Sequence, residues 1–121
     1  MKVLFVDTNI FLRFLLVDSK KQYSLAKKLF QRAEEGKISL WTTDIVILEI
    51  VWTLKSFYKL SRQKIQNKIS SLMALKNLKV KNQKFLLQAL DYFVLKNVSF
   101  ADAYNFLLTK KEKRKIISFD R

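Results

Sequence analysis

The chain has 121 residues, half of them hydrophobic, which is the length of one domain with a core of its own. It has no His and no Cys, which excludes a Ser-His-Asp triad, an imidazole-based zinc site and a disulfide framework. One Gly and no Pro exclude the glycine-rich loops that cradle phosphates.

The charge balance is strongly basic. The chain has 24 Lys and Arg against 10 Asp and Glu, a formal net charge of +14. Such a charge indicates a polyanionic partner, with nucleic acid ahead of an anionic membrane surface or an acidic protein. A Lys-rich surface that serves solubility alone is the competing interpretation.

Short apolar runs alternate with stretches of helical periodicity, which is typical of an α/β fold. In chain order we expect a strand at 2–6, helices at 9–17 and 19–36, a strand at 37–41, helices at 43–58 and 61–73, a strand at 78–80, helices at 85–94 and from 99 onward, and a strand at 115–119. The expected helix N-caps are Ser19, Thr42 or Thr43, Ser61 and Ser99, and Gly36 is expected to close the second helix.

No stretch of the chain approaches the roughly 20 apolar residues of a membrane span. The first residues begin like a signal peptide, but Asp7, Asn9 and Arg13 interrupt the apolar run early. We therefore expect no membrane segment and a cytoplasmic location.

Four carboxylates stand out in this acid-poor chain. Asp7 and Asp120 each follow a predicted strand, and Asp102 lies in the first turn of the last predicted helix. Glu49 is the one charge between Ile45 and Leu54. That stretch is apolar nearly all round, which predicts a buried helix and a Glu that needs a partner or a cation.

Each of these acids also has an ordinary structural explanation. Asp7 and Asp102 are suited to helix capping, Glu49 to a buried ion pair with Lys, and Asp120 to a surface position near the C-terminus. Their joint placement favours function, because strand ends and helix starts meet at one edge of an α/β sheet. Clustered carboxylates repel one another, and magnesium or manganese relieves that repulsion through oxygen ligands.

Four motifs in this order resemble the PIN domains, most closely the VapC-type toxins of toxin–antitoxin pairs. They are Val6-Asp7-Thr8-Asn9, Leu48-Glu49, Phe100-Ala101-Asp102-Ala103 and Ile117-Ser118-Phe119-Asp120. The resemblance runs from Val3 to Asp120. It implies one domain over 1–121, which lacks the family's usual C-terminal strand, with a three-layer α/β sandwich. Its central, mostly parallel sheet would have about four strands flanked by helices.

The same resemblance implies a ribonuclease that uses Mg²⁺ or Mn²⁺. Asp7, Glu49, Asp102 and Asp120 become the metal-binding and catalytic set, with Asn9 and Ser118 as supporting polar groups. The implied partners are RNA, a cognate antitoxin and a second copy of the chain in a homodimer.

Two other hypotheses are kept beside this one. The first is a non-catalytic PIN-like module that binds RNA or an antitoxin, which the short C-terminus favours. The second is a phosphatase with Asp7 as nucleophile, which Asn9 disfavours because an amide is no general acid.

Overall fold

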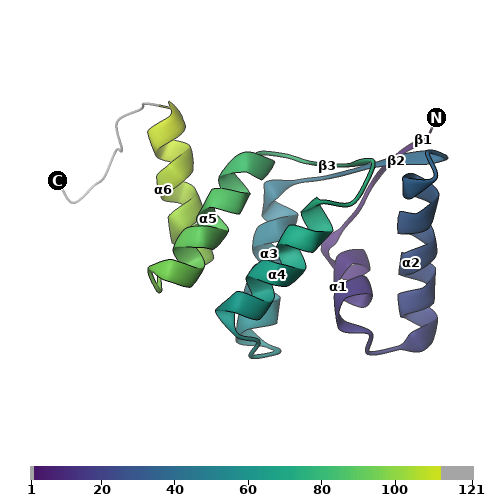
Figure 1. The fold of residues 1–121 in the computed structure, drawn as a ribbon, viewed down its shortest axis with the longest axis horizontal. Coiled ribbons are helices and arrows are strands. Elements are labelled where there is room, and N and C mark those ends of the chain that lie inside the picture. Colours follow the sequence, from purple (N-terminus) through teal and green to yellow (C-terminus); the bar gives the residue numbers. More distant parts are fainter. Residues whose placement is uncertain (1, 113–121) are drawn as a thin grey trace.

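The computed structural model describes residues 2–112 of the chain (Figure 1). Within these residues the elements are β1 (Lys2–Phe5), α1 (Thr8–Leu16), α2 (Lys20–Glu34), β2 (Ile38–Thr42), α3 (Asp44–Ser56), α4 (Arg62–Met73), β3 (Leu78–Val80), α5 (Gln83–Leu95) and α6 (Phe100–Glu112). The fourth predicted strand, at 115–119, lies outside the described residues.

The three described strands form one parallel sheet in the order β1-β2-β3. The register pairs Leu4 with Leu40, and Leu40 in turn with Leu78. In Figure 1 the helices lie next to one another across the view as three pairs. The pairs are α1 with α2, α3 with α4 and α5 with α6, and the two helices of each pair are in contact. The predicted α/β class, with a parallel sheet flanked by helices, is confirmed.

Alternation along the strands decides which side of the sheet faces the core. In β2 the side chains of Ile38, Leu40 and Thr42 are buried, while Trp41 between them is exposed. Helix α2 packs on β2 and α4 packs on β3. Successive side chains of a strand point to opposite faces, so one face of β2 carries the core contacts.

Side-chain caps begin the helices where the sequence predicts them. Ser19, Thr43 and Ser61 each accept a hydrogen bond from the backbone N–H three residues further on. Such caps contribute about 1 kcal/mol each to helix stability. Gly36 follows α2 with φ of +79°, a left-handed conformation that glycine adopts without strain. The N-termini of α2, α3 and α4 and the end of α2 are therefore determined by local residues that the sequence displays.

Helix α3 corrects one prediction. Its apolar residues were expected to bury the whole helix, but Ile45 is 64% exposed and Trp52 is 67% exposed. Glu49 lies on the same side of the helix and is exposed as well. The prediction of a buried Glu49 is wrong, because the neighbouring elements cover only the face of α3 that carries Ile47, Ile50 and Leu54.

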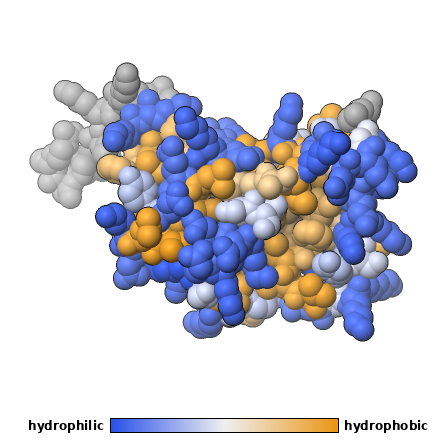
Figure 2. All heavy atoms as spheres, viewed as in Figure 1, coloured by the Kyte–Doolittle hydropathy of each residue, from blue (hydrophilic) through white to orange (hydrophobic). Residues whose placement is uncertain are grey.

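Exposed apolar side chains also occur elsewhere on the molecule. Figure 2 shows patches of them among the hydrophilic side chains on one face. Within residues 2–112, the structure contains no helix with the length and hydrophobicity that a membrane span requires.

Candidate functional site

The carboxyl ends of the three parallel strands lie at one edge of the sheet. Asp7 follows β1, Asp44 opens the helix after β2, and Asn82 follows β3. In open α/β sheets this edge is where ligands bind. The search for a candidate site therefore begins at this edge of the sheet.

Two hydrogen bonds fix the backbone that leads into Asp7. The N–H of Val6 donates to the Trp41 carbonyl at 2.9 Å. The Thr42 hydroxyl donates to the Val6 carbonyl at 2.8 Å, and Thr42 is the one fully buried polar residue among those described. Both the N–H and the carbonyl of Val6 are therefore hydrogen-bonded to the end of β2, which fixes the backbone just before Asp7.

The Asp7 side chain caps α1 and leaves one oxygen uncommitted. Its Oδ1 accepts a hydrogen bond from the Ile10 N–H at 3.2 Å. No second hydrogen bond to this carboxylate occurs within residues 2–112, and Asp7 is exposed. The capping explanation is thus correct for one oxygen, and Oδ2 remains available to a ligand.

Glu49 meets this corner of the molecule from α3. The Thr8 hydroxyl donates to Glu49 Oε2 at 3.2 Å, across 41 positions of sequence. Since Thr8 is the neighbour of Asp7, this contact brings the two predicted site acids to one place. The structure therefore unites Asp7 and Glu49, although Glu49 arrives as an exposed and not as a buried group.

Asp102 lies elsewhere in the structure. Its backbone N–H donates to the Ser99 hydroxyl at 3.0 Å, which is the capping arrangement at the start of α6. Its exposed side chain lines a hollow of about 250 Å³. The same hollow is lined by Tyr92 in α5, Lys96 directly after α5 and Phe106 in α6. The structure does not bring Asp102 to Asp7 and Glu49.

The other two predicted site residues, Ser118 and Asp120, lie outside the described residues. Within residues 2–112 no group of three or more Asp and Glu side chains is arranged to hold a metal ion. The described part of the site is therefore the pair formed by Asp7 and Glu49.

This pair fits a hard divalent cation. Its donors are carboxylate oxygens, and Mg²⁺ in proteins is commonly held by one or two carboxylates with waters in the remaining positions. Both side chains are exposed, so water can complete such a shell. Asp7 and Glu49 are the residues that would hold the ion.

Sequence reasoning missed Asp44, a third acid at the same edge. Asp44 Oδ2 accepts hydrogen bonds from the Tyr104 hydroxyl at 2.5 Å and from Asn82 Nδ2 at 3.3 Å. Asn82 Nδ2 also donates to the Tyr104 oxygen at 3.0 Å. The available signal was an Asp directly after the Thr43 cap, a position that favours acids through the helix dipole alone.

The pKa values of this trio follow from its contacts. Burial acts to raise the pKa of Asp44, but hydrogen bonds from Tyr104, Asn82 and the Ile45 N–H, with the nearby Lys81 charge, bring it below the usual 3.8. Burial, followed by the hydrogen bond to Asp44, raises the pKa of Tyr104 to about 12. Asp44 is thus committed as an acceptor within the fold, which separates it from the Asp7–Glu49 pair.

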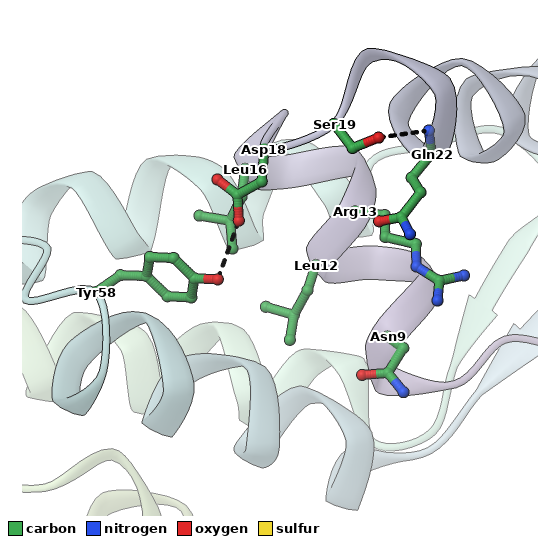
Figure 3. A pocket seen from close by; sticks show the side chains of 8 residues that line it. All are labelled: Asn9, Leu12, Arg13, Leu16, Asp18, Ser19, Gln22 and Tyr58. Atoms are coloured by element: carbon green, nitrogen blue, oxygen red, sulfur yellow. Dashed lines mark hydrogen bonds between the residues drawn. The ribbon is translucent and has the colours of Figure 1, made fainter.

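A polar cavity adjoins the candidate site. It has a volume of about 290 Å³ and lies between α1, the start of α2 and Tyr58 (Figure 3). Asn9, one of the predicted supporting residues, lines this cavity, two positions beyond Asp7. The structure therefore places Asn9 in the cavity lining, on the helix that Asp7 caps.

The architecture of a parallel sheet flanked by helices agrees with the comparison to known families. The family model described as "PIN domain" matches residues 4–121. The chain belongs to the PIN domain family, and the resemblance predicted from its four motifs is confirmed.

Two relatives illustrate the similarity. A protein named VapC ribonuclease from Aquifex aeolicus (strain VF5) is 25% identical over 117 residues, which cover 96% of this chain and 86% of that protein. The chain also aligns with the crystal structure of VapC20 from Mycobacterium tuberculosis, titled a sarcin-ricin loop cleaving toxin. That alignment has 17% identity and a TM-score of 0.45, and covers 91% of this chain and 83% of that one.

Proposed function

We propose that this chain is a ribonuclease that hydrolyses RNA phosphodiester bonds with Mg²⁺ or Mn²⁺ and acts as the toxin of a toxin–antitoxin pair. The observation that carries the proposal is the Thr8–Glu49 hydrogen bond of 3.2 Å, which joins the α3 acid to the residue that follows the strand-end Asp7. The relative named VapC ribonuclease supports the same class of activity.

The chain's own residues would act in distinct ways. Asp7 and Glu49 would hold the ion, and the Thr8 hydroxyl would orient Glu49 through one of its two carboxylate oxygens. When bound, the ion supplies polarisation of the scissile phosphate and a lower pKa for the attacking water. Because the chain has no His, a carboxylate would be the general base that accepts the proton of the attacking water.

Asp102 and Asp120 complete the proposed set of acids, with Ser118 as a supporting group. The excess of Lys and Arg would bind the RNA backbone, which carries one negative charge per nucleotide. The proposed setting is the cytoplasm, with a cognate antitoxin as inhibitor and a homodimer as the assembled form.

One observation favours a second candidate, a non-catalytic module that binds RNA or an antitoxin. Asp102 points into a hollow formed with α5 residues and makes no contact with the Asp7–Glu49 pair. A two-acid site is a weaker base for hydrolysis than the full set, and the binding module needs neither Asp102 nor the ion.

The deciding experiment is cleavage of a mixed pool of single-stranded and structured RNA with magnesium, with manganese and with EDTA. The wild-type protein is compared with Asp7→Asn and with Asp91→Asn, a control that alters an exposed carboxylate on α5 bonded to Gln66. We expect metal-dependent cutting that Asp7→Asn abolishes and Asp91→Asn retains. Folded protein that binds RNA and cuts it under none of these conditions would establish the binding module instead.

A further inference from the structure

The polar cavity beside the candidate site has a lining unlike that of a core void. Leu12 and Leu16 supply apolar surface, and Arg13, Gln22 and Tyr58 supply polar and aromatic groups. In Figure 3 Arg13 lies toward Gln22 at the start of α2, whereas Leu12 lies on the side of α1 that faces Tyr58, two residues beyond the end of α3. Polar groups placed around a small apolar surface can fix the orientation of a bound small ligand.

The Tyr58 ring is fixed in place by Asp18. The Tyr58 hydroxyl donates a hydrogen bond to Asp18 Oδ2 at 3.1 Å, and Asp18 lies in the turn between α1 and α2 (Figure 3). The ring is half-buried, so it is ordered without being covered completely. Tyr58 therefore presents a positioned aromatic surface at one wall of the cavity.

Arg13 supplies a guanidinium group without a carboxylate partner. Among residues 2–112 the structure has one ion pair, between Lys37 and Glu35, so Arg13 is unpaired within that range. A guanidinium group both stacks on flat rings and donates in-plane hydrogen bonds. Asn9 and Gln22 add amides, which both donate and accept.

The cavity and the proposed cleavage site share helix α1. Asp7 caps α1, and Asn9, Leu12 and Arg13 lie on the same helix. At 1.5 Å per residue, Arg13 lies about 9 Å along the helix from Asp7. A strand with its phosphate at Asp7 and Glu49 would therefore pass its neighbouring nucleotide over the cavity.

We propose that this cavity receives one unstacked base of a single-stranded RNA, next to the phosphate that a cation bound by Asp7 and Glu49 would hold. The inference rests on the proposed ribonuclease function and adds a specificity site to it. The cavity volume of about 290 Å³ suits one flat heterocycle and not a folded nucleic acid. Splayed bases are recognised by aromatic or guanidinium stacking together with amide hydrogen bonds, which is the set of groups that this cavity offers.

The test separates base recognition from backbone binding. Asp7→Asn protein is titrated with fluorescein-labelled homopolymers of A, C, G and U, and with an abasic ribose-phosphate strand of the same length. We expect at least one homopolymer to bind roughly tenfold more tightly than the abasic strand, since one stacked base contributes about 1–3 kcal/mol. Gln22→Ala and Tyr58→Leu, each added to Asp7→Asn, should lose most of that preference.

The matched control is Arg32→Gln, which alters an exposed basic residue near the far end of α2. Arg32→Gln should lower the affinity for the homopolymers and for the abasic strand by the same factor, and so leave the preference between them unchanged. Circular dichroism and a thermal melt of each variant establish that the fold is intact, and Gln22→Ala replaces an exposed helix residue with a better helix former.

Each other outcome overturns the proposal. Equal binding of homopolymers and abasic strand, no binding of either, or a preference that survives both substitutions would show that no base occupies the cavity. RNA cleavage by the protein with Asp7 intact is scored separately, so a failure of the base pocket is distinguished from a failure of the ribonuclease function.

Discussion

The Tyr104 hydroxyl on α6 donates a hydrogen bond of 2.5 Å to the Asp44 carboxylate at the start of α3. The two residues are 60 positions apart in the chain. Their contact joins the last described helix to the carboxyl edge of the sheet, where Asn82 also reaches Asp44. Tyr104 is 2% exposed, so this junction lies inside the protein.

Tyr104→Phe should lower the free energy of unfolding by about 1.5–3 kcal/mol, because a hydrogen bond to a charged acceptor is lost inside the fold. Urea unfolding at neutral pH measures the difference. The control is Tyr92→Phe on the exposed surface of α5, which should stay within about 0.5 kcal/mol of wild type. Equal stability of all three proteins would show that the Tyr104–Asp44 contact contributes nothing.

The same tyrosine predicts a change at alkaline pH. Its pKa is raised from 10.0 to about 12, so the folded state keeps this proton to higher pH than the unfolded state. The stability linked to Tyr104 is therefore complete below pH 10 and is lost as pH rises from 10 to 12. The stability difference between wild type and Tyr104→Phe should shrink over that window in urea titrations. A constant difference would contradict the raised pKa.

Arg62→Lys should loosen the turn before α6. The Arg62 guanidinium donates to the carbonyls of Phe93 and Val98 at 2.7 Å each and lies 4.3 Å from the Phe93 ring centroid. Lysine lacks the planar fork, so we expect a loss of about 1–3 kcal/mol and faster amide exchange in the first turn of α6. Arg32→Lys on exposed α2 is the control, and the two substitutions should differ clearly in hydrogen exchange.

Glu49→Gln tests the acid pair directly. Because Glu49 is exposed, we expect the free energy of unfolding without metal to change by no more than about 0.5 kcal/mol. Removing the negative charge of Glu49 also removes its repulsion of Asp7, which favours the folded state. Affinity for Mn²⁺, measured by isothermal titration calorimetry, should fall markedly. Glu34→Gln at the end of α2 is the control and should bind as wild type does. Unchanged Mn²⁺ binding in Glu49→Gln would remove Glu49 from the site.

Salt should weaken RNA binding steeply. The net charge of +14 predicts several Lys or Arg contacts to phosphates, each of which releases a counterion on binding. Six such contacts would reduce affinity by about 10³-fold between 50 and 200 mM salt. Fluorescence anisotropy with a non-cleaving variant measures the slope. A nearly flat response would mean that the basic residues are not an RNA-binding surface.

Much of the fold could be predicted because its signals are local. The caps Ser19, Thr43 and Ser61 and the closing Gly36 mark helix ends through hydrogen bonds and backbone conformation of neighbouring residues. The alternating pattern of β2 reflects packing on one face of the sheet. Such features depend on a few adjacent residues, which a single sequence displays.

The candidate site was harder to predict because it depends on how distant elements are packed. Glu49 was expected to be buried, since an apolar helix does not reveal from its sequence which sides its neighbours will cover. Asp44 was missed because its partners Asn82 and Tyr104 lie 38 and 60 positions away. The position of Asp102 likewise follows from the way α6 packs on α5, which no spacing along the chain specifies.

The Thr42 hydroxyl, which binds the Val6 carbonyl at 2.8 Å, sets a limit for protein engineering. Stabilisation strategies commonly replace a buried polar residue with an apolar one of the same shape, and Thr42→Val would pass every volume criterion. The exchange would also leave the Val6 carbonyl without its donor, one residue before Asp7. A redesign judged by side-chain volume alone would therefore remove the residue that holds the backbone next to Asp7.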